Sequence, residues 1–386
     1  MKSIEKEIAE IKRQQAFRHR RILQSPQDTQ VTVDGKQFIS FCSNDYLGLA
    51  NDARVIDAAR EALGKYGVGS GASQLISGYS ALHSKLEGQL ADFFGFESAV
   101  LFSSGYLANL GVLSKFACRK TLILQDLLNH ASLIDAAKLS NARLKRYRHC
   151  DVTQAERILI KEDPESFLIV TDGVFSMEGT VAPLKNLIDL KNKHNGMLVI
   201  DDAHGIGVLG ETGKGSIEQC NVNPADIDIF IGTFGKSFGS SGAFVCGNKN
   251  YIQYLIQKAR PLIYTTAPAP ALAAAACKSL EIIISDTQRR TRLHDNIHYF
   301  RKQLKNTSLQ LENSTSAIQT ILLGKNETAL EFSHALERQG LLVVAIRPPT
   351  VPKNTARLRI TLSSQHNQDQ IDKLVSALLK TDARLN

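Results

Sequence analysis

The segment TFGKSFG, residues 233–239, follows a mostly apolar run at residues 227–232 and carries Lys236 between two glycines. An apolar run that ends in a glycine-containing turn is typical of a strand buried on both faces of a parallel sheet. Lys236 is therefore expected just beyond the carboxyl end of a strand. A lysine in this place is either an exposed turn residue or a desolvated amine that attacks a carbonyl and forms a Schiff base. A phosphate-binding P-loop is excluded, because that motif needs glycine where the chain has Phe230.

Similar apolar runs alternate with helical windows through most of the chain. They predict strands at residues 99–102, 121–125, 143–148, 167–171, 197–200, 227–232 and 243–246. This alternation is typical of an α/β fold with a mostly parallel sheet. From residue 279 the pattern changes to long helical windows with short strands at 318–323, 341–346 and 356–362, which indicates a smaller α+β domain.

The beginning of the chain has a different pattern. Residues 4–21 are expected to form an amphipathic helix, and residues 30–41 a hairpin with an Asp34-Gly35 turn. The sequence therefore predicts three parts: an N-terminal helix and hairpin segment (1–45), a large domain (46–278) and a small C-terminal domain (279–386).

Polar and glycine residues follow five of the predicted strands, at the sheet edge where such folds bind ligands. They are Gly105, Tyr106, His130, Ser176, Asp201, His204 and Thr233. Each alone is explained as an ordinary turn, cap or loop residue. Together with Lys236 they indicate one site.

Pyridoxal 5'-phosphate (PLP) chemistry requires this kind of residue set: an imine-forming lysine, an acid on the pyridine nitrogen, a donor to the 3'-oxygen and a phosphate cup. Asp201 is the candidate acid, and His204 is the candidate donor. The backbone N–H groups of Gly105 and Tyr106 open a predicted helix and suit a phosphate, with the Thr233 hydroxyl beside them. His130 either stacks on the cofactor ring or caps the next helix.

Several strings match a known family: FCSNDYLGLA (41–50), FSSGYLANL (102–110), DDAHGIG (201–207), TFGKSFG (233–239) and AIRPPTVPKNTARLRITL (345–362). From about residue 40 to 365 the chain resembles the α-oxoamine synthases, PLP-dependent enzymes of fold type I. The resemblance implies an aminotransferase-like large domain that binds the cofactor and a homodimer. Gln74 is a departure, because many family members have arginine there.

The resemblance also implies roles for individual residues. Lys236 would form the Schiff base, Asp201 would pair with the pyridine nitrogen, and His204 with the 3'-oxygen. His130 would stack on the ring and contact substrate. The remaining residues that it implies line the cofactor (Gly105, Tyr106, Ser176, Thr233), bind substrate (Arg18, Thr350, and Arg359 at the substrate carboxylate) or reach the partner subunit's phosphate (Thr266).

The expected reaction is an acyl transfer with decarboxylation. The segment at 345–362 favours family members that condense L-alanine with a pimeloyl thioester, on coenzyme A or acyl carrier protein, to 8-amino-7-oxononanoate, CO2 and the free thiol in biotin biosynthesis. Glycine C-acetyltransferase and 5-aminolevulinate synthase activities stay open, because those enzymes share the catalytic residues. A non-catalytic subunit is disfavoured by the presence of Lys236. A nicotinamide-binding domain is disfavoured because GVGSGAS (67–73) follows a helical window.

Composition limits the partners. Lysine and arginine total 46 against 38 acids, a net charge of +8 over 386 residues, and the chain has no tryptophan. Neither basic run, 18–21 or 143–148, is interleaved with aromatic residues, so no nucleic-acid partner is expected. No long apolar run or secretory signal is recognisable, and six scattered cysteines form no Cys-x-x-Cys pair. We therefore expect a cytoplasmic protein with no membrane segment and no metal site.

Overall fold

The computed structural model describes residues 3–14, 16–348 and 350–385. The chain packs into two compact units. Unit 1 comprises Met1–Gly48, Met177–Gly179 and Thr291–Asn386, and unit 2 comprises Leu49–Ser176 and Thr180–Arg290. The division into parts at residues 45/46 and 278/279 stays a prediction of how the chain is organised.

Unit 2 contains a seven-stranded sheet in the order β3-β9-β8-β7-β6-β4-β5. Only β9 is antiparallel to its neighbours β3 and β8, and the other pairs are parallel. The predicted mostly parallel α/β sheet is confirmed. The strands are β3 (Ser98–Phe102), β4 (Thr121–Asp126), β5 (Arg143–Tyr147), β6 (Ser166–Asp172), β7 (Met197–Asp201), β8 (Ile229–Thr233) and β9 (Ala243–Gly247).

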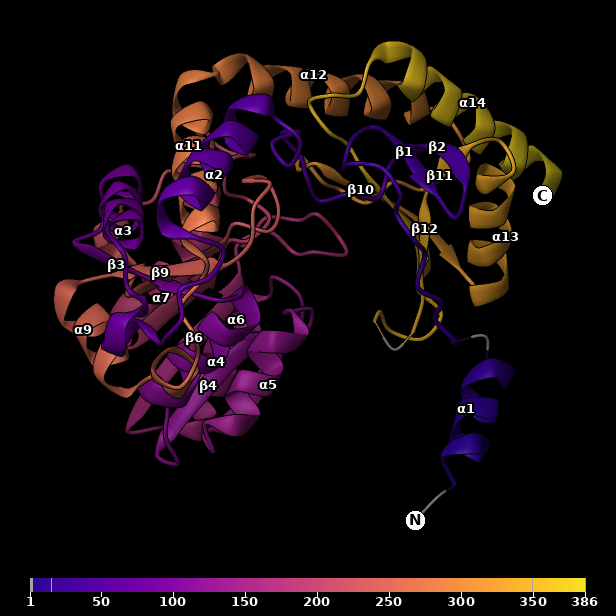
Figure 1. Cartoon of the computed structure of the whole chain (residues 1–386). Helices are drawn as coiled ribbons and strands as arrows, with labels where there is room; N and C mark the ends of the chain where they lie inside the picture. The colour runs from indigo at the N-terminus through magenta and orange to yellow at the C-terminus, as the bar shows by residue number, and fades with distance from the viewer. Residues whose placement is uncertain (1–2, 15, 349, 386) are drawn as a thin grey trace. The chain divides into compact units, whose positions relative to one another are not determined.

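Helices cover the sheet of unit 2 (Figure 1). They are α2 (Ala53–Tyr66), α3 (Ala81–Phe94), α4 (Gly105–Phe116), α5 (Ala131–Leu139), α6 (Val152–Glu162), α7 (Leu184–Lys193), α8 (Ser216–Gln219), α9 (Lys249–Lys258), α10 (Arg260–Ile263) and α11 (Pro270–Ser285), with a π-helical turn at Gln74–Gly78 and a 3-10 turn at Pro224–Asp226. Gln74 donates to the Leu101 carbonyl of β3 at 2.9 Å.

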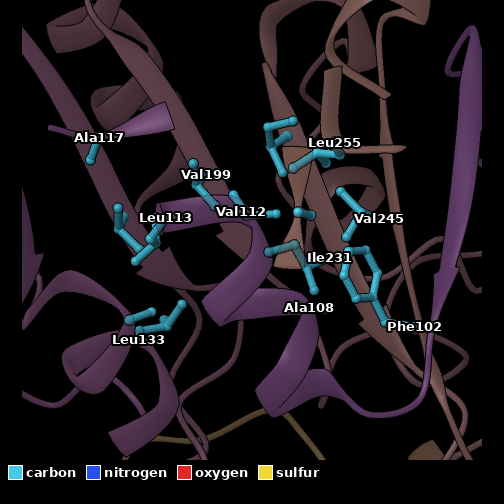
Figure 2. Close-up of a cluster of buried hydrophobic side chains, with 14 of the residues drawn as sticks. Phe102, Ala108, Val112, Leu113, Ala117, Leu133, Val199, Ile231, Val245 and Leu255 are labelled. Carbon is cyan, nitrogen blue, oxygen red and sulfur yellow. The ribbon is translucent and has the colours of Figure 1, made fainter. Parts of the chain in front are cut away.

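The core of unit 2 fixes helix α4 against the sheet. Ala108 and Val112 of α4 pack with Val199, Ile231 and Val245, which come from three adjacent strands (Figure 2). All five side chains are buried. Burial of a valine or isoleucine side chain contributes roughly 1.5–3 kcal/mol. The N-terminus of α4 is therefore held firmly at the carboxyl edge of the sheet.

Unit 1 holds two three-stranded sheets. In one, β1 (Gln30–Val33) and β2 (Lys36–Ser40) form an antiparallel hairpin, and β2 pairs in parallel with β11 (Leu341–Leu342). In the other, β13 (Ala356–Thr361) lies between β10 (Ile318–Gly324) and β12 (Val344–Ile346). The helices are α1 (Ile4–Arg13), α13 (Asn326–Glu337) and α14 (Gln368–Leu385), and α12 (Thr287–Leu304) begins in unit 2 and continues into unit 1.

Two sequence predictions are wrong in detail. The helix expected over 4–21 ends at Arg13. Beyond it, the Ile22 carbonyl accepts from the Asp34 N–H and the Gln24 N–H donates to the Thr32 carbonyl, so the chain leaves the helix before it pairs with the β1–β2 hairpin. The strand expected over 341–346 is two strands, β11 and β12, because the chain switches from one sheet to the other at Val343. None of the described helices is long and apolar enough to cross a membrane.

Candidate active site

The carboxyl ends of the central strands bring acidic residues together. Asp172 at the end of β6 and Asp201 at the end of β7 are opposite each other in the parallel ladder. Asp201 is also paired with Ile231 of β8, two residues before Thr233. Both aspartates are buried. The register therefore places Asp201 in the middle of the sheet edge from which the Lys236 turn departs.

Asp201 is held by donors on both carboxylate oxygens. Asn109 Nδ2 of α4 donates to Oδ2 at 2.7 Å, and the Ala203 N–H donates to Oδ1 at 3.1 Å. Both partners donate, as suits a carboxylate that accepts hydrogen bonds only. The side chain is 6% exposed. The Asp201 carboxylate is therefore held in a fixed orientation at the sheet edge.

A chain of hydrogen bonds connects Asp201 to His130. Asn109 Nδ2 also donates to Ser132 Oγ at 2.8 Å, and Ser132 Oγ lies 2.7 Å from His130 Nδ1. Because Ser132 Oγ accepts from Asn109, its own proton is available for Nδ1. The Ser132 N–H also donates to Nδ1, at 3.3 Å. Nδ1 is therefore an acceptor, and the neutral ring carries its proton on Nε2.

The Lys236 turn is fixed from several sides. Thr233 Oγ1 donates to the Gly242 carbonyl at 2.9 Å, and the Gly239 N–H donates to the Lys236 carbonyl at 2.8 Å. Gly239 has φ +61°, and a Cβ there would lie 2.1 Å from the backbone nitrogen of Ala50. Glycine is required at this position for both reasons. Lys236 itself is half-buried.

Charges at this edge act on one another. Burial lowers the pKa of His130, the charge of Asp201 raises it and the charge of Lys236 lowers it further. Burial and the charge of Asp201 raise the pKa of Asp172 well above its ordinary value, while its bond from the His130 N–H and the charge of Lys236 oppose the rise. His130 is therefore neutral at pH 7, and Asp172 resists ionisation. Lys236, His130 and Asp201 belong to one electrostatic site.

Helix α4 begins beside this cluster. Ser104 caps it by accepting from the Leu107 N–H at 3.2 Å, and helix residues Gly105 and Tyr106 follow. First-turn N–H groups have no partner within their helix, and they form the positive end of its dipole. The Tyr106 hydroxyl donates to Asp135 at 2.6 Å. The helix start suits an anion such as a phosphate.

The other predicted cofactor residues lie in loops of unit 2. His204 is buried in the loop after β7, and Ser176 follows β6. Thr266 is exposed, and its backbone forms a bridge with Ser73.

The predicted substrate residues lie in unit 1. Arg359 on β13 is 7% exposed and donates from Nη2 to Asn44 Oδ1 at 3.2 Å. Arg18 is exposed and donates from Nη2 to Thr350 Oγ1 at 3.3 Å. Arg18 and Thr350 line a cavity of about 550 Å³ whose other basic side chains are His19, Arg21, His334 and Arg347.

The residues of unit 2 fit PLP. The donor set contains a lysine in a fixed turn, a carboxylate for a ring nitrogen, and a helix N-terminus with the Thr233 hydroxyl nearby for a phosphate. Asn109 supports the fit further. It is fully buried, and its Oδ1 has no hydrogen-bond partner among the described residues. Both of its side-chain hydrogen bonds are donated by Nδ2, one to Asp201 and one to Ser132, which lies next to His130.

Sequence reasoning missed Asn109, Ser132 and Asp172. The signal for Asn109 was present, because an amide within the apolar helix LANLGVL is costly to bury without partners. Ser132 and Asp172 had no such signal. Ser132 reads as a first-turn residue and Asp172 as a strand-end turn, and only the register of the sheet brings Asp172 beside Asp201.

Comparisons with known proteins identify the family of the chain. The model for class I and II aminotransferases matches residues 36–378. The 8-amino-7-oxononanoate synthase of Methylococcus capsulatus is 48% identical over 371 residues, which is 96% of each chain. That of Marinobacter nauticus is 47% identical over 386 residues, which is 100% of this chain and 98% of the relative.

Solved structures match as well. A lysine-to-alanine variant of a serine palmitoyltransferase from S. paucimobilis, with a bound PLP–myriocin aldimine, has a TM-score of 0.94 and 30% identity, with coverage of 100% of this chain and 99% of that one. The 8-amino-7-oxononanoate synthase from Francisella tularensis has a TM-score of 0.80 and 32% identity, covering 90% and 98%. The predicted PLP fold type I is confirmed. The chain belongs to the class I and II aminotransferase family and, within it, to the 8-amino-7-oxononanoate synthases.

Proposed function

We propose that the protein catalyses the decarboxylative condensation of L-alanine with a pimeloyl thioester, which gives 8-amino-7-oxononanoate, CO2 and the free thiol in biotin biosynthesis. The observation that carries the proposal is 45–48% identity over nearly the full length to proteins named for this reaction. The expected PLP cofactor and acyltransferase class are confirmed by the same family membership.

Bound PLP supplies an electron sink for the negative charge that develops at the alanine α-carbon. Lys236 would hold the cofactor covalently and, once the substrate amine has displaced it, would take the α-proton at Nζ. Asp201 keeps a proton on the pyridine nitrogen, since a neighbouring anion favours the charged form. Asn109 orients that carboxylate.

His130 acts as a neutral donor. With Nδ1 occupied by Ser132, its proton is on Nε2, and it is offered to the thioester carbonyl oxygen as charge develops there. A donor aimed at a developing oxyanion stabilises the transition state by several kcal/mol, on the order of 3. Its ring face would pack on the cofactor.

The remaining residues hold cofactor and substrate. Gly105, Tyr106 and Thr233 would bind the phosphate, Ser176 would line the cofactor, and His204 would hydrogen-bond the 3'-oxygen. Arg359 binds the alanine carboxylate through the paired N–H donors of its planar guanidinium group. Arg18 and Thr350 contact the acyl donor in the basic cavity of unit 1, which suits the carboxylate or phosphates of such a donor.

We place this function in a homodimer, with Thr266 reaching the phosphate bound by the other subunit. The exposed position of Thr266 supports this assignment. We place the protein in the cytoplasm, which its six free cysteine thiols support, because reduced thiols persist in that compartment.

A donor and acceptor panel tests the proposal. Purified protein with PLP is given L-alanine or glycine, each with pimeloyl, succinyl or acetyl thioester, on coenzyme A and, for pimeloyl, also on acyl carrier protein. The highest kcat/KM is expected for alanine with a pimeloyl thioester. One methyl group is worth only ~1–3 kcal/mol, so discrimination against glycine is expected to be moderate. Faster reaction of glycine with acetyl-coenzyme A would assign the chain to the glycine C-acetyltransferase activity instead.

A further inference from the structure

His149 lies between two loops at the carboxyl edge of the sheet in unit 2. Its Nδ1 is 3.1 Å from Asp126 Oδ2 at the end of β4, and its Nε2 is 2.8 Å from Thr180 Oγ1. Its ring meets the Phe175 ring edge-on, with 4.4 Å between centroids. None of these residues has a role in the reaction described above.

Asp126 organises the loop that carries His130. It is 1% exposed, and its Oδ1 accepts from the Leu128 N–H at 2.8 Å. Its own carbonyl accepts from the Asn129 N–H at 3.2 Å, one residue before His130. The bond from His149 to Asp126 therefore acts on the base of the His130 loop.

Thr180 and Phe175 belong to the turn that carries Ser176. The Phe175 N–H donates to the Thr180 carbonyl at 2.9 Å, and Val174 forms a bridge with Val181. Ser176 comes directly after Phe175. The two contacts of His149 in this turn, one polar and one aromatic, thus flank Ser176 on both sides.

The polar surroundings of His149 favour a charged ring. Burial lowers the pKa of His149, but its hydrogen bonds to Asp126 and Cys150 and the charges of both outweigh burial and raise the pKa to about 10. As an imidazolium it donates from both nitrogens at once, to Asp126 and to Thr180.

The backbone beside His149 is in an unusual conformation. Cys150 has φ +56°, and the other non-glycine residues with positive φ in the described part of the chain are all Asn or Asp. This left-handed residue lets the Cys150 N–H donate to Asp126 Oδ2 at 2.7 Å. Such a conformation is unfavourable for cysteine, so it persists because the surrounding contacts hold it.

We propose that His149 is a positioning residue that ties the loop carrying His130 to the turn carrying Ser176, so that both face the cofactor in a fixed relation. This inference rests on the proposed function only for the roles of His130 and Ser176.

The two bonds can be cut separately. His149→Asn keeps an amide donor near the Nδ1 position, facing Asp126, and loses Thr180. His149→Gln keeps a donor near Nε2, facing Thr180, and loses Asp126. Thr180→Val removes the same bond as His149→Asn without altering the histidine. His194→Asn is the matched control, because His194 bonds to Glu156 at 3.2 Å and has the same 26% side-chain exposure as His149.

Amide hydrogen exchange of the full chain without PLP is the first readout. His149→Asn and Thr180→Val are expected to speed exchange in the peptide covering 173–182 roughly five-fold, the effect of losing one typical hydrogen bond. His149→Gln is expected to speed exchange in the peptide covering 127–134 instead. Combining His149→Asn with Thr180→Val adds nothing further to the 173–182 peptide, because both remove one interaction. His194→Asn changes neither peptide.

PLP affinity and steady-state kinetics complete the test. His149→Asn and Thr180→Val are expected to weaken PLP binding and lower kcat several-fold, with Tm equal to that of His194→Asn. Unchanged exchange at 173–182 in both variants, or faster exchange spread evenly over the whole chain, would overturn the proposal. Because exchange is measured without substrate, failure of the pimeloyl reaction would contradict the proposed function and leave this result standing.

Discussion

Asn109 Nδ2 donates to Asp201 Oδ2 across 2.7 Å from the interior of α4, four residues after the helix begins. The same helix thus presents its first N–H groups at one end and a donor to the central carboxylate one turn later. Because α4 packs on three adjacent strands, both features are positioned relative to the carboxyl edge of the sheet (Figure 2).

Replacement of Asn109 tests whether that donor matters. In Asn109→Leu, which conserves volume, the carboxylate of Asp201 loses its 2.7 Å donor, and a buried group left unsatisfied costs about 1–3 kcal/mol. We expect kcat to fall about ten-fold or more with the circular dichroism spectrum unchanged. Wild-type turnover in a folded variant would mean that Ala203 alone orients Asp201.

Ser132→Ala tests the proton position on His130. Ser132 Oγ lies 2.7 Å from Nδ1, and its proton favours the neutral ring. Without it the pKa of His130 is expected to rise from its lowered value, so the acid limb of the kcat profile moves to higher pH. The titration of the His130 ring by NMR measures this directly. An unshifted acid limb together with an unshifted ring titration would contradict the assigned tautomer.

Replacement by asparagine is expected to affect activity very differently at Asp201 and at Asp202. Burial raises the pKa of Asp202 to about 8, and its Oδ2 accepts from the Ser216 N–H at 2.7 Å. Asp202 is therefore mostly protonated at pH 7, and Asp202→Asn is expected to keep at least half of the activity. Asp201→Asn keeps the fold but loses most activity, since an amide cannot stabilise a protonated pyridine.

The raised pKa of Asp202 also predicts that the stability of the protein depends on pH. Its folded pKa lies above the unfolded value near 4, so its contribution to stability is complete below pH 4 and is lost as pH rises through 8. Between pH 6 and 9 the Tm of the wild type is expected to fall more than that of Asp202→Asn. Parallel Tm profiles would show that Asp202 ionises normally in the folded chain.

Arg359→Lys tests substrate specificity within unit 1. The lysine keeps the positive charge but loses the planar fork that matches a carboxylate. We expect KM for L-alanine to rise about ten-fold, and KM for the pimeloyl thioester to change much less. The reverse pattern would place Arg359 at the acyl donor.

The sequence predicted the sheet and the residues at its edge because both depend on local patterns. Buried strands such as IFI (229–231) and MLVI (197–200) are continuous apolar runs, and the Lys236 turn is marked by its glycines. The Asn109–Ser132–His130 chain could not be predicted, because it depends on the packing of α4 against α5. The early end of α1 was missed for a similar reason. Residues 22–24 pair with residues 32–34 of the β1–β2 hairpin, and the helical pattern of residues 4–21 gives no sign of this pairing.

The central claim is that Lys236 supports a condensation that releases the carboxyl carbon of alanine. The most direct measurement uses L-alanine labelled with ¹³C at C1 and a pimeloyl thioester, and it counts labelled CO2, free thiol and 8-amino-7-oxononanoate by mass spectrometry. We expect equal amounts of the three, with no label in the organic product and none of the three formed by Lys236→Ala. Thiol release without labelled CO2, or an undiminished yield from Lys236→Ala, would contradict it.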